Sequence, residues 1–136
     1  MKTKHYLFGF LVEIDETRTR SWYAAAKEWD CDCGDCRSFV ALAHERHLPA
    51  HMLETLDELG IPPEKATYVC MLYSDGDGQH YQCSYRIAGS ILSEAADTKG
   101  AGQCCHEPYP YGAPGFPEPH FDLEFRFTLS GASDEQ

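Results

Sequence analysis

The chain lacks any long apolar run and has few basic residues. No stretch of its 136 residues approaches the roughly 18 apolar positions of a membrane-spanning helix, so we expect no membrane partner. Only 11 Lys and Arg stand against 22 Asp and Glu, which gives a formal net charge of -11. Because such a surface repels phosphate, we expect no nucleic-acid partner. A protein with a basic surface is a better match for this charge.

Motifs that mark common catalytic sites are also missing. The sequence has no G-x-S-x-G nucleophile turn, no phosphate-binding G-x-x-x-x-G-K loop and no G-x-G-x-x-G dinucleotide motif. These absences favour a non-catalytic protein. They leave room for sites such as Ser-His-Asp, whose members need not be close in sequence.

Cysteine is present, but it is too sparse for a small disulfide-stabilised scaffold. Seven cysteines are about 5% of the chain, below the roughly 8–10% typical of such scaffolds, and their number is odd. The apolar run from Tyr6 to Val12 is followed by Glu13 and Asp15, not by the small residues of a signal-peptide cleavage site. We therefore expect reduced thiols and a cytoplasmic location.

The length and the periodicity of the sequence predict one α+β domain over residues 1–136. Apolar residues on both faces predict a buried strand from Tyr6 to Ile14. Helical spacing predicts a helix over 17–28, a second one capped by Asp35, and a third between Pro49 and Gly60 that pairs with the second as a helical hairpin.

Alternation with a period of two predicts the strands of the C-terminal half. These strands are 68–73 and 80–87, joined by a turn at 74–78, and 121–129. Residues 91–96 fit either a short strand or a helical turn. The expected fold is an antiparallel sheet of about four to six strands. Two or three helices from the N-terminal half pack on it, with Trp22 and Trp29 in the core and Asp122, Glu124, Arg126 and Thr128 outward.

Residues 98–120 are expected to form a long Pro/Gly-rich loop. The segment holds five prolines and four glycines, and a loop of this length is uncommon unless it is functional or held in place. One hypothesis is that a small-molecule site lies beneath it, with Tyr109, Tyr111 and Phe116 as a lid. Alternatively, the segment crosses a sheet edge of its own domain or is bound as an extended peptide by a partner.

A dense group of cysteines offers the clearest chemistry. Cys31, Cys33 and Cys36 lie around a glycine at a helix start, and their thiolates can converge on one ion. Zinc requires four N or S ligands, so a fourth must come from elsewhere. The candidates are Cys104, Cys105 and His106 in the long loop, which a metal bond would hold in place.

Two other interpretations of these cysteines stay open. They can be ordinary reduced residues, as Cys70 and Cys83 are expected to be in the strands. Alternatively, Cys33 and Cys36 form a redox-active C-x-x-C pair whose thiol pKa a helix N-terminus lowers. Neighbouring acidic side chains oppose that lowering, and the βαβ surroundings of thioredoxin-like motifs are missing.

The segment Trp29-Asp30-Cys31-Asp32-Cys33-Gly34-Asp35-Cys36-Arg37-Ser38-Phe39 resembles a W-x-CxCxxC-R-x-F motif of a group of short, uncharacterised bacterial proteins. The resemblance covers about residues 15–65. It implies a small bacterial cytosolic protein, and it carries no activity, substrate or cofactor.

These observations favour a small acidic cytosolic protein that acts as a non-catalytic binding or interaction domain, with zinc as the candidate cofactor at the cysteine group. The alternatives are a thiol-active protein that uses Cys33 and Cys36, or a small-molecule-binding enzyme with its site under residues 98–120. The sequence His44-Glu45-Arg46-His47 is interpreted as a solvated helix face, because metalloprotease helices space their histidines four apart.

Overall fold

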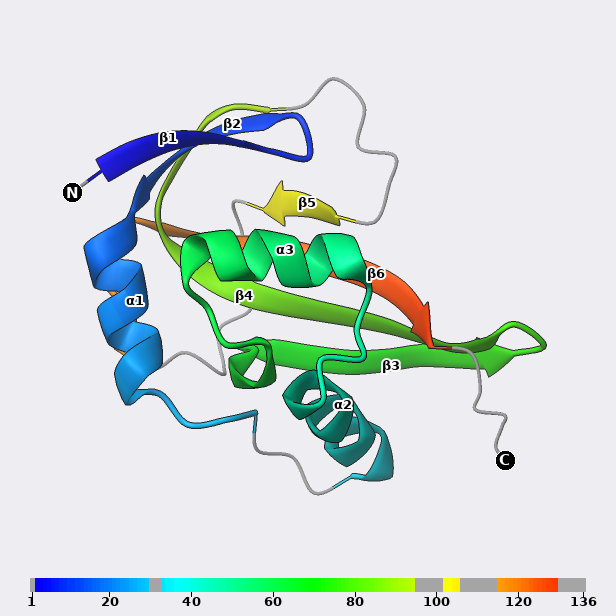
Figure 1. The fold of residues 1–136 in the computed structure, drawn as a ribbon. Helices are drawn as coiled ribbons and strands as arrows, with labels where there is room; N and C mark the ends of the chain where they lie inside the picture. The colour runs from blue at the N-terminus through cyan, green and yellow to red at the C-terminus, as the bar shows by residue number, and fades with distance from the viewer. Residues whose placement is uncertain (1, 30–32, 95–101, 106–114, 130–136) are drawn as a thin grey trace.

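The protein is an α+β domain, seen in a computed structural model that describes residues 2–29, 33–94, 102–105 and 115–129. Its strands are β1 (Lys2–Leu7), β2 (Phe10–Asp15), β3 (Tyr68–Asp75), β4 (Gly78–Ser93), β5 (Gly102–Cys105) and β6 (His120–Leu129). Its helices are α1 (Glu16–Ala25), α2 (Gly34–His44) and α3 (Ala50–Leu59), followed by the short 3-10 helix η1 (Pro63–Lys65). The predicted fold class is confirmed (Figure 1).

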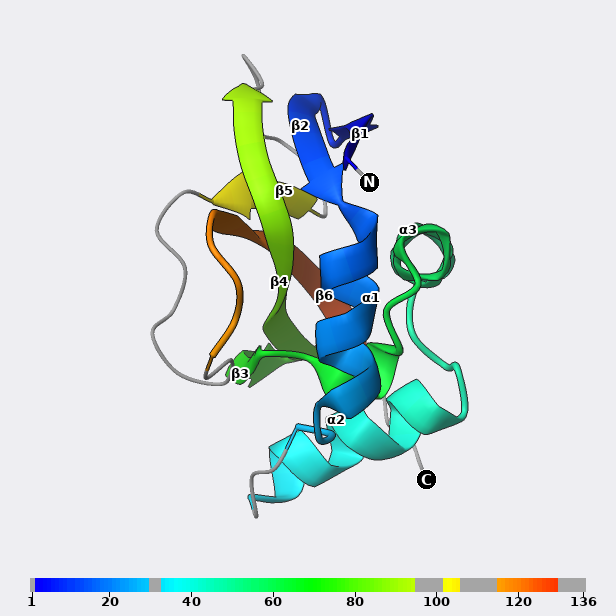
Figure 2. The ribbon, with the colours of Figure 1, turned by 90° about the vertical axis from the view of Figure 1, so that its left-hand side faces the viewer.

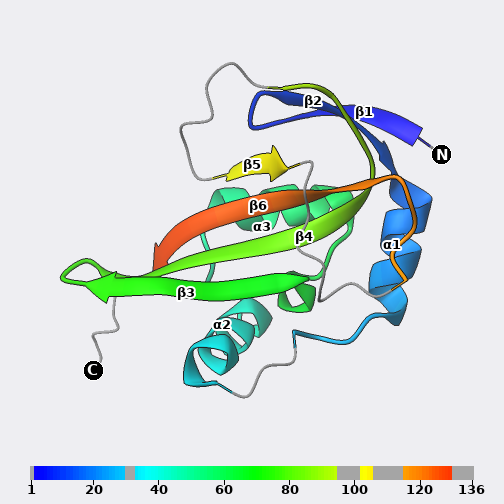
Figure 3. The ribbon, with the colours of Figure 1, turned by 180° about the vertical axis from the view of Figure 1, so that it is seen from behind.

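The sheet is organised around the 16-residue strand β4. Its first half pairs with β3 and its second half with β2, so these two strands follow one another along one edge of β4. Strand β6 pairs with the other edge over Gln79–Ala88, and β5 pairs with the far edge of β6. All of these pairings are antiparallel, and Figure 3 shows the curved β4 between its neighbours.

The N-terminal segment is a hairpin, so the prediction of one strand from Tyr6 to Ile14 is wrong. Strands β1 and β2 pair in register from Lys2↔Asp15 to Leu7↔Phe10. The turn is made by Phe8 and Gly9, whose φ angles are 53° and 86°. Two successive positive φ angles are the requirement of a type I′ hairpin turn.

The helices occupy the N-terminal half, as predicted. Helix α1 begins after Asp15, whose side chain accepts a hydrogen bond from the Arg18 backbone N–H, and it ends at Ala25, short of the predicted residue 28. Helix α3 ends as expected at Gly60, which has a φ of 74°. Helices α2 and α3 do not form the predicted helical hairpin. Their axes are not antiparallel: in Figure 2 the view runs along the axis of α3, whereas α2 lies across the view.

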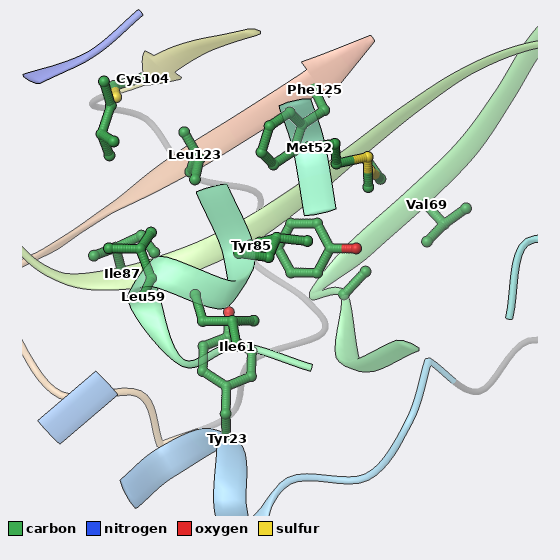
Figure 4. Packing of buried hydrophobic residues seen from close by; sticks show 14 of the residues in the cluster. Tyr23, Met52, Leu59, Ile61, Val69, Tyr85, Ile87, Cys104, Leu123 and Phe125 are labelled. Atoms are coloured by element: carbon green, nitrogen blue, oxygen red, sulfur yellow. The ribbon is translucent and has the colours of Figure 1, made fainter. Parts of the chain in front are cut away.

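The core lies between one face of the sheet and helices α1, α2 and α3 (Figure 1), and Figure 4 shows Tyr23 of α1 pointing into it. Tyr23 and Tyr85 are fully buried at its centre, and their hydroxyls donate to the carbonyls of Arg86 (2.8 Å) and Pro63 (2.6 Å). These bonds satisfy the polar end of each ring. Trp22 and Trp29, predicted as core pieces, are only partly buried at its margin.

Part of the segment predicted as a loop over 98–120 is structured. Gly102–Cys105 forms β5 against β6, and Phe116 packs on Trp22 (ring centroids 4.9 Å apart) and on Tyr23 (6.3 Å). Tyr109 and Tyr111 lie outside the described residues. A strand ladder and an aromatic contact thus hold the described parts in place.

Candidate functional site

The first turn of helix α2 carries two of the predicted site residues. Cys33 is the N-cap, and its sulfur accepts a hydrogen bond from the Cys36 backbone N–H at 3.3 Å. Asp35, predicted as the cap, instead lies within the first turn. A backbone N–H aimed at the sulfur stabilises its thiolate form, as does the positive end of the helix dipole.

The two thiols differ in exposure. Cys33 is exposed, whereas Cys36 is buried at 6% and belongs to the hydrophobic core. The cap therefore presents one thiol to solvent and holds the second one behind it, one turn into the helix. Cys31, the third member of the group, lies outside the described residues.

A tyrosine from β4 lies against the same turn. The Tyr81 hydroxyl donates to the Asp35 carbonyl at 3.0 Å, and its ring stacks on Phe127 at 5.7 Å between centroids. Burial raises the pKa of Tyr81 to about 12, and negative charge at Asp35, Cys36 and Cys33 contributes further. The phenol therefore stays a neutral hydrogen-bond donor, and the turn has an acidic environment.

The cysteines proposed as the source of a fourth ligand lie on another part of the sheet. Cys104 and Cys105 are in β5, whereas α2 packs beside β3 and contacts the first residues of β4 through Tyr81. Two strands, β6 and β4, lie between β5 and β3. Three strand spacings are about 14 Å. Figures 1 and 3 show β5 and α2 on opposite sides of β4. The structure therefore does not bring these two residues to Cys33 and Cys36, and His106 lies outside the described residues.

Burial keeps three of the other thiols, Cys83, Cys104 and Cys105, protonated. It raises the pKa of Cys104 to about 12 and that of Cys105 to about 11, and the carboxylates of Glu124 and Asp122 add to the effect at Cys105. Cys83 is fully buried, and desolvation raises its pKa strongly. The core role expected for Cys83 is confirmed.

On the sheet face away from α2 and α3, a group of polar side chains is buried. Glu124 accepts hydrogen bonds from the side chains of Gln82 (3.0 Å) and Gln103 (2.7 Å), and Arg86 pairs with Asp122 at 3.1 Å. Asp122 and Glu124 are 2% and 5% exposed, so the expectation that they face solvent is wrong, whereas Arg126 and Thr128 are exposed as predicted.

Three further ligating side chains come together where the sequence gave no signal. Glu28 follows α1, His44 ends α2 and Glu64 lies in η1, and one ligand atom from each lies within 4.8 Å of the others. His44 Nε2 is 2.9 Å from Glu28 Oε1, and this hydrogen bond is the main cause that raises the pKa of His44. His44 and His47 are both exposed, as expected for a solvated helix face, but the His44 ring is hydrogen-bonded to Glu28.

A pocket of about 340 Å³ opens beside this trio. It lies between the end of α2, the end of α3 and η1, and both His44 and Glu64 line it. Arg46 and Asp57, which form an ion pair at 2.6 Å, also line the pocket. It is therefore built by elements other than the 98–120 segment, where the sequence placed a small-molecule site.

A hydrogen-bonded Thr-His-Asp chain lies at the turn end of the β3–β4 hairpin. The Thr128 hydroxyl is 2.8 Å from His80 Nδ1, and His80 Nε2 is 2.9 Å from Asp75 Oδ1. Tyr73 stacks on the imidazole at 4.3 Å between centroids. These contacts join the ends of three strands, which is a structural role.

Comparison of the chain with models of protein families, with curated proteins and with solved structures finds no match. The resemblance of residues 29–39 to a motif of short bacterial proteins therefore stays a prediction. Among the helices of the described residues, none has the length and apolar character needed to cross a membrane.

Proposed function

We propose that the protein is a small acidic binding domain and that the segment Cys31–Cys36 binds a zinc ion through its thiols. The observation that carries this proposal is the N-cap geometry at Cys33, whose sulfur accepts the Cys36 N–H at 3.3 Å. It holds two thiols at one helix start, and the N–H directed at the Cys33 sulfur stabilises the thiolate of that residue.

The donor set fits zinc in its chemistry. Thiolate sulfurs are among the preferred ligands of Zn²⁺, and the sequence adds Cys31 two residues before Cys33. Four ligands make a closed structural site. The fourth is a side chain or a water, because Cys104 and Cys105 lie across the sheet. The ion would stabilise the connection between α1 and α2.

The test is the metal content of two matched variants. Cys33→Ser removes one proposed ligand, whereas Cys70→Ser removes a half-buried thiol of β3 that has no part in the proposal. We expect Cys33→Ser to lose bound zinc and Cys70→Ser to retain it. Equal metal content in the two variants would refute the site.

The charge of the whole chain supports a basic protein as the partner. A formal net charge of -11 attracts a basic surface and repels nucleic acid. The proposed location is the cytoplasm, where thiols such as the six described free cysteines stay reduced. Binding to a basic partner should weaken as salt is added, since salt screens exposed charges.

Thiol-disulfide exchange is the second candidate function, and the unequal exposure of Cys33 and Cys36 favours it. The Cys33 thiolate would attack a substrate disulfide and release one substrate thiolate. Cys36, once deprotonated, would then attack the Cys33 sulfur and release the second substrate thiolate. The substrate gains two electrons and the protein ends with a Cys33–Cys36 disulfide.

The rate of alkylation as a function of pH decides this second candidate. A thiol pKa well below 8.5 at Cys33 in metal-free protein would support exchange. A pKa near 8.5 would exclude thiol-disulfide exchange. The negative charges around the turn would then have cancelled the lowering of the thiol pKa by the helix N-terminus.

A further inference from the structure

The trio Glu28, His44 and Glu64 is assembled by three separate elements at the end of α2 away from the cysteines. The backbone N–H of Trp29 donates to the Glu64 carbonyl at 3.0 Å, which fixes the residue after Glu28 beside η1. The Trp29 ring packs edge-on against Tyr68 at 6.2 Å between centroids. Helix α2 contacts η1 directly, so the backbone holds all three positions together.

The ligand atoms of His44 and Glu28 have the spacing of a metal site, and a ligand atom of Glu64 lies near both. Two ligands about 2.1 Å from one ion are about 3.0–3.4 Å apart at octahedral or tetrahedral angles. His44 Nε2 and Glu28 Oε1 are already 2.9 Å apart, and an oxygen of Glu64 lies within 4.8 Å of both. Small side-chain rotations of Glu64 would complete the set.

The pocket gives such an ion an open side. Because His44 and Glu64 line the pocket of about 340 Å³, coordination positions left free by the protein would face that space. Waters or a small ligand can fill them there. An imidazole with two carboxylates is a set that suits ions of intermediate hardness such as Mn²⁺ and Zn²⁺, and the two negative charges balance a divalent ion.

We propose that Glu28, His44 and Glu64 form a divalent metal site that opens into this pocket. It is separate from the cysteine segment, since the 11 residues of α2 place its two ends about 16 Å apart. The proposal does not depend on zinc at the thiols.

Manganese is the probe that separates the two sites. Carboxylate and imidazole ligands suit Mn²⁺, whereas thiolates select softer ions. The experiment is a Mn²⁺ titration of metal-free protein followed by electron paramagnetic resonance, in which bound ion loses the sharp six-line signal of the free ion. We expect saturable binding of about one Mn²⁺ per chain.

Matched variants assign the site. His44→Ala and Glu64→Gln should each weaken Mn²⁺ binding at least about tenfold, the scale seen even for loss of an outer-shell partner. His47→Ala should leave the affinity unchanged, because the His47 side chain is 67% exposed and its ion pair is with Glu45, which is not part of the trio. The double variant Cys33→Ser/Cys36→Ser, checked for folding by circular dichroism, should also bind Mn²⁺ like the parent chain.

Several results would overturn the inference. These are no saturable Mn²⁺ binding, unchanged affinity in both His44→Ala and Glu64→Gln, or loss of binding in the cysteine double variant while it stays folded. Failure here leaves the zinc proposal untouched, because that proposal is tested by metal content in Cys33→Ser.

Discussion

At the scale of single residues, the sulfur of Cys33 has two roles that can be separated. It caps α2 by accepting the Cys36 N–H, and it is a proposed zinc ligand. The sequence predicted Asp35 as the cap because carboxylates are common N-caps and cysteine is not. The chain instead starts the helix two residues earlier, which leaves Asp35 in the first turn, where its charge suits the helix dipole.

Cys33→Ser and Cys33→Ala should differ in stability when both are metal-free. Serine is a good N-cap, so Cys33→Ser should change the free energy of unfolding by less than about 0.5 kcal/mol. Alanine cannot accept the N–H, so Cys33→Ala should cost about 1 kcal/mol. Urea unfolding in excess chelator measures both, and equal stabilities would show that the cap bond contributes nothing.

A second residue-scale prediction concerns the buried ion pair of Arg86 and Asp122. Their side chains are 6% and 2% exposed, and Arg86 Nε donates to Asp122 Oδ1 at 3.1 Å. Asp122→Ala leaves a buried guanidinium without this carboxylate, which should cost about 3–5 kcal/mol. Arg126→Ala, at an exposed position of the same strand, should cost less than about 0.5 kcal/mol. Similar losses in the two variants would contradict the role given to the pair.

At the scale of elements, sequence reasoning predicted the helices and strands that have a regular apolar pattern or a recognisable terminal residue. Helix α3 ends at Gly60 and β6 alternates as expected, because each signal is local. The β1–β2 hairpin was missed because Phe8 continues the apolar alternation through the turn, and no residue pair there is a standard hairpin signal. The strand β5 was missed because its pairing with β6 is long-range and its four residues show no pattern of their own.

Strand β4 contains a glycine that the packing of β2 requires. A Cβ at position 89 would lie 2.0 Å from the Glu13 carbonyl oxygen. The φ angle of Gly89, 150°, is also one that residues with a side chain rarely adopt. Gly89→Ala should therefore cost more than about 1 kcal/mol and weaken amide protection in β2. Gly76→Ala, with no atom within 4 Å of the added Cβ, is the control, and thermal unfolding compares them. Equal melting temperatures of the two variants would contradict the close approach of β2 to β4 at Gly89.

At the scale of the whole molecule, the candidate sites show what sequence reasoning can reach. The cysteine group was visible because its members are close in sequence. The trio of Glu28, His44 and Glu64 was not visible in the sequence, because its residues come from separate elements that meet only in the folded chain. The burial of Asp122 and Glu124 was also out of reach, since alternation says which face a side chain takes and not whether that face meets water.

Removal of the proposed zinc should loosen one region and leave the sheet intact. The core is formed by the sheet with α1, α2 and α3, and the proposed thiol ligands lie outside its strands. After chelation, hydrogen exchange should quicken at the Cys36 amide, while amides in β4 and β6 keep their protection. Uniform loss of protection across the chain would mean instead that the ion maintains the whole fold.

The most direct test of the central claim is the zinc content of the native protein, purified without chelator or nickel, together with a count of its reactive thiols. The account predicts about one zinc per chain and at least three thiols that react only after chelation. Protein without zinc, in which Cys33 reacts at once as an ordinary exposed thiol, would contradict it.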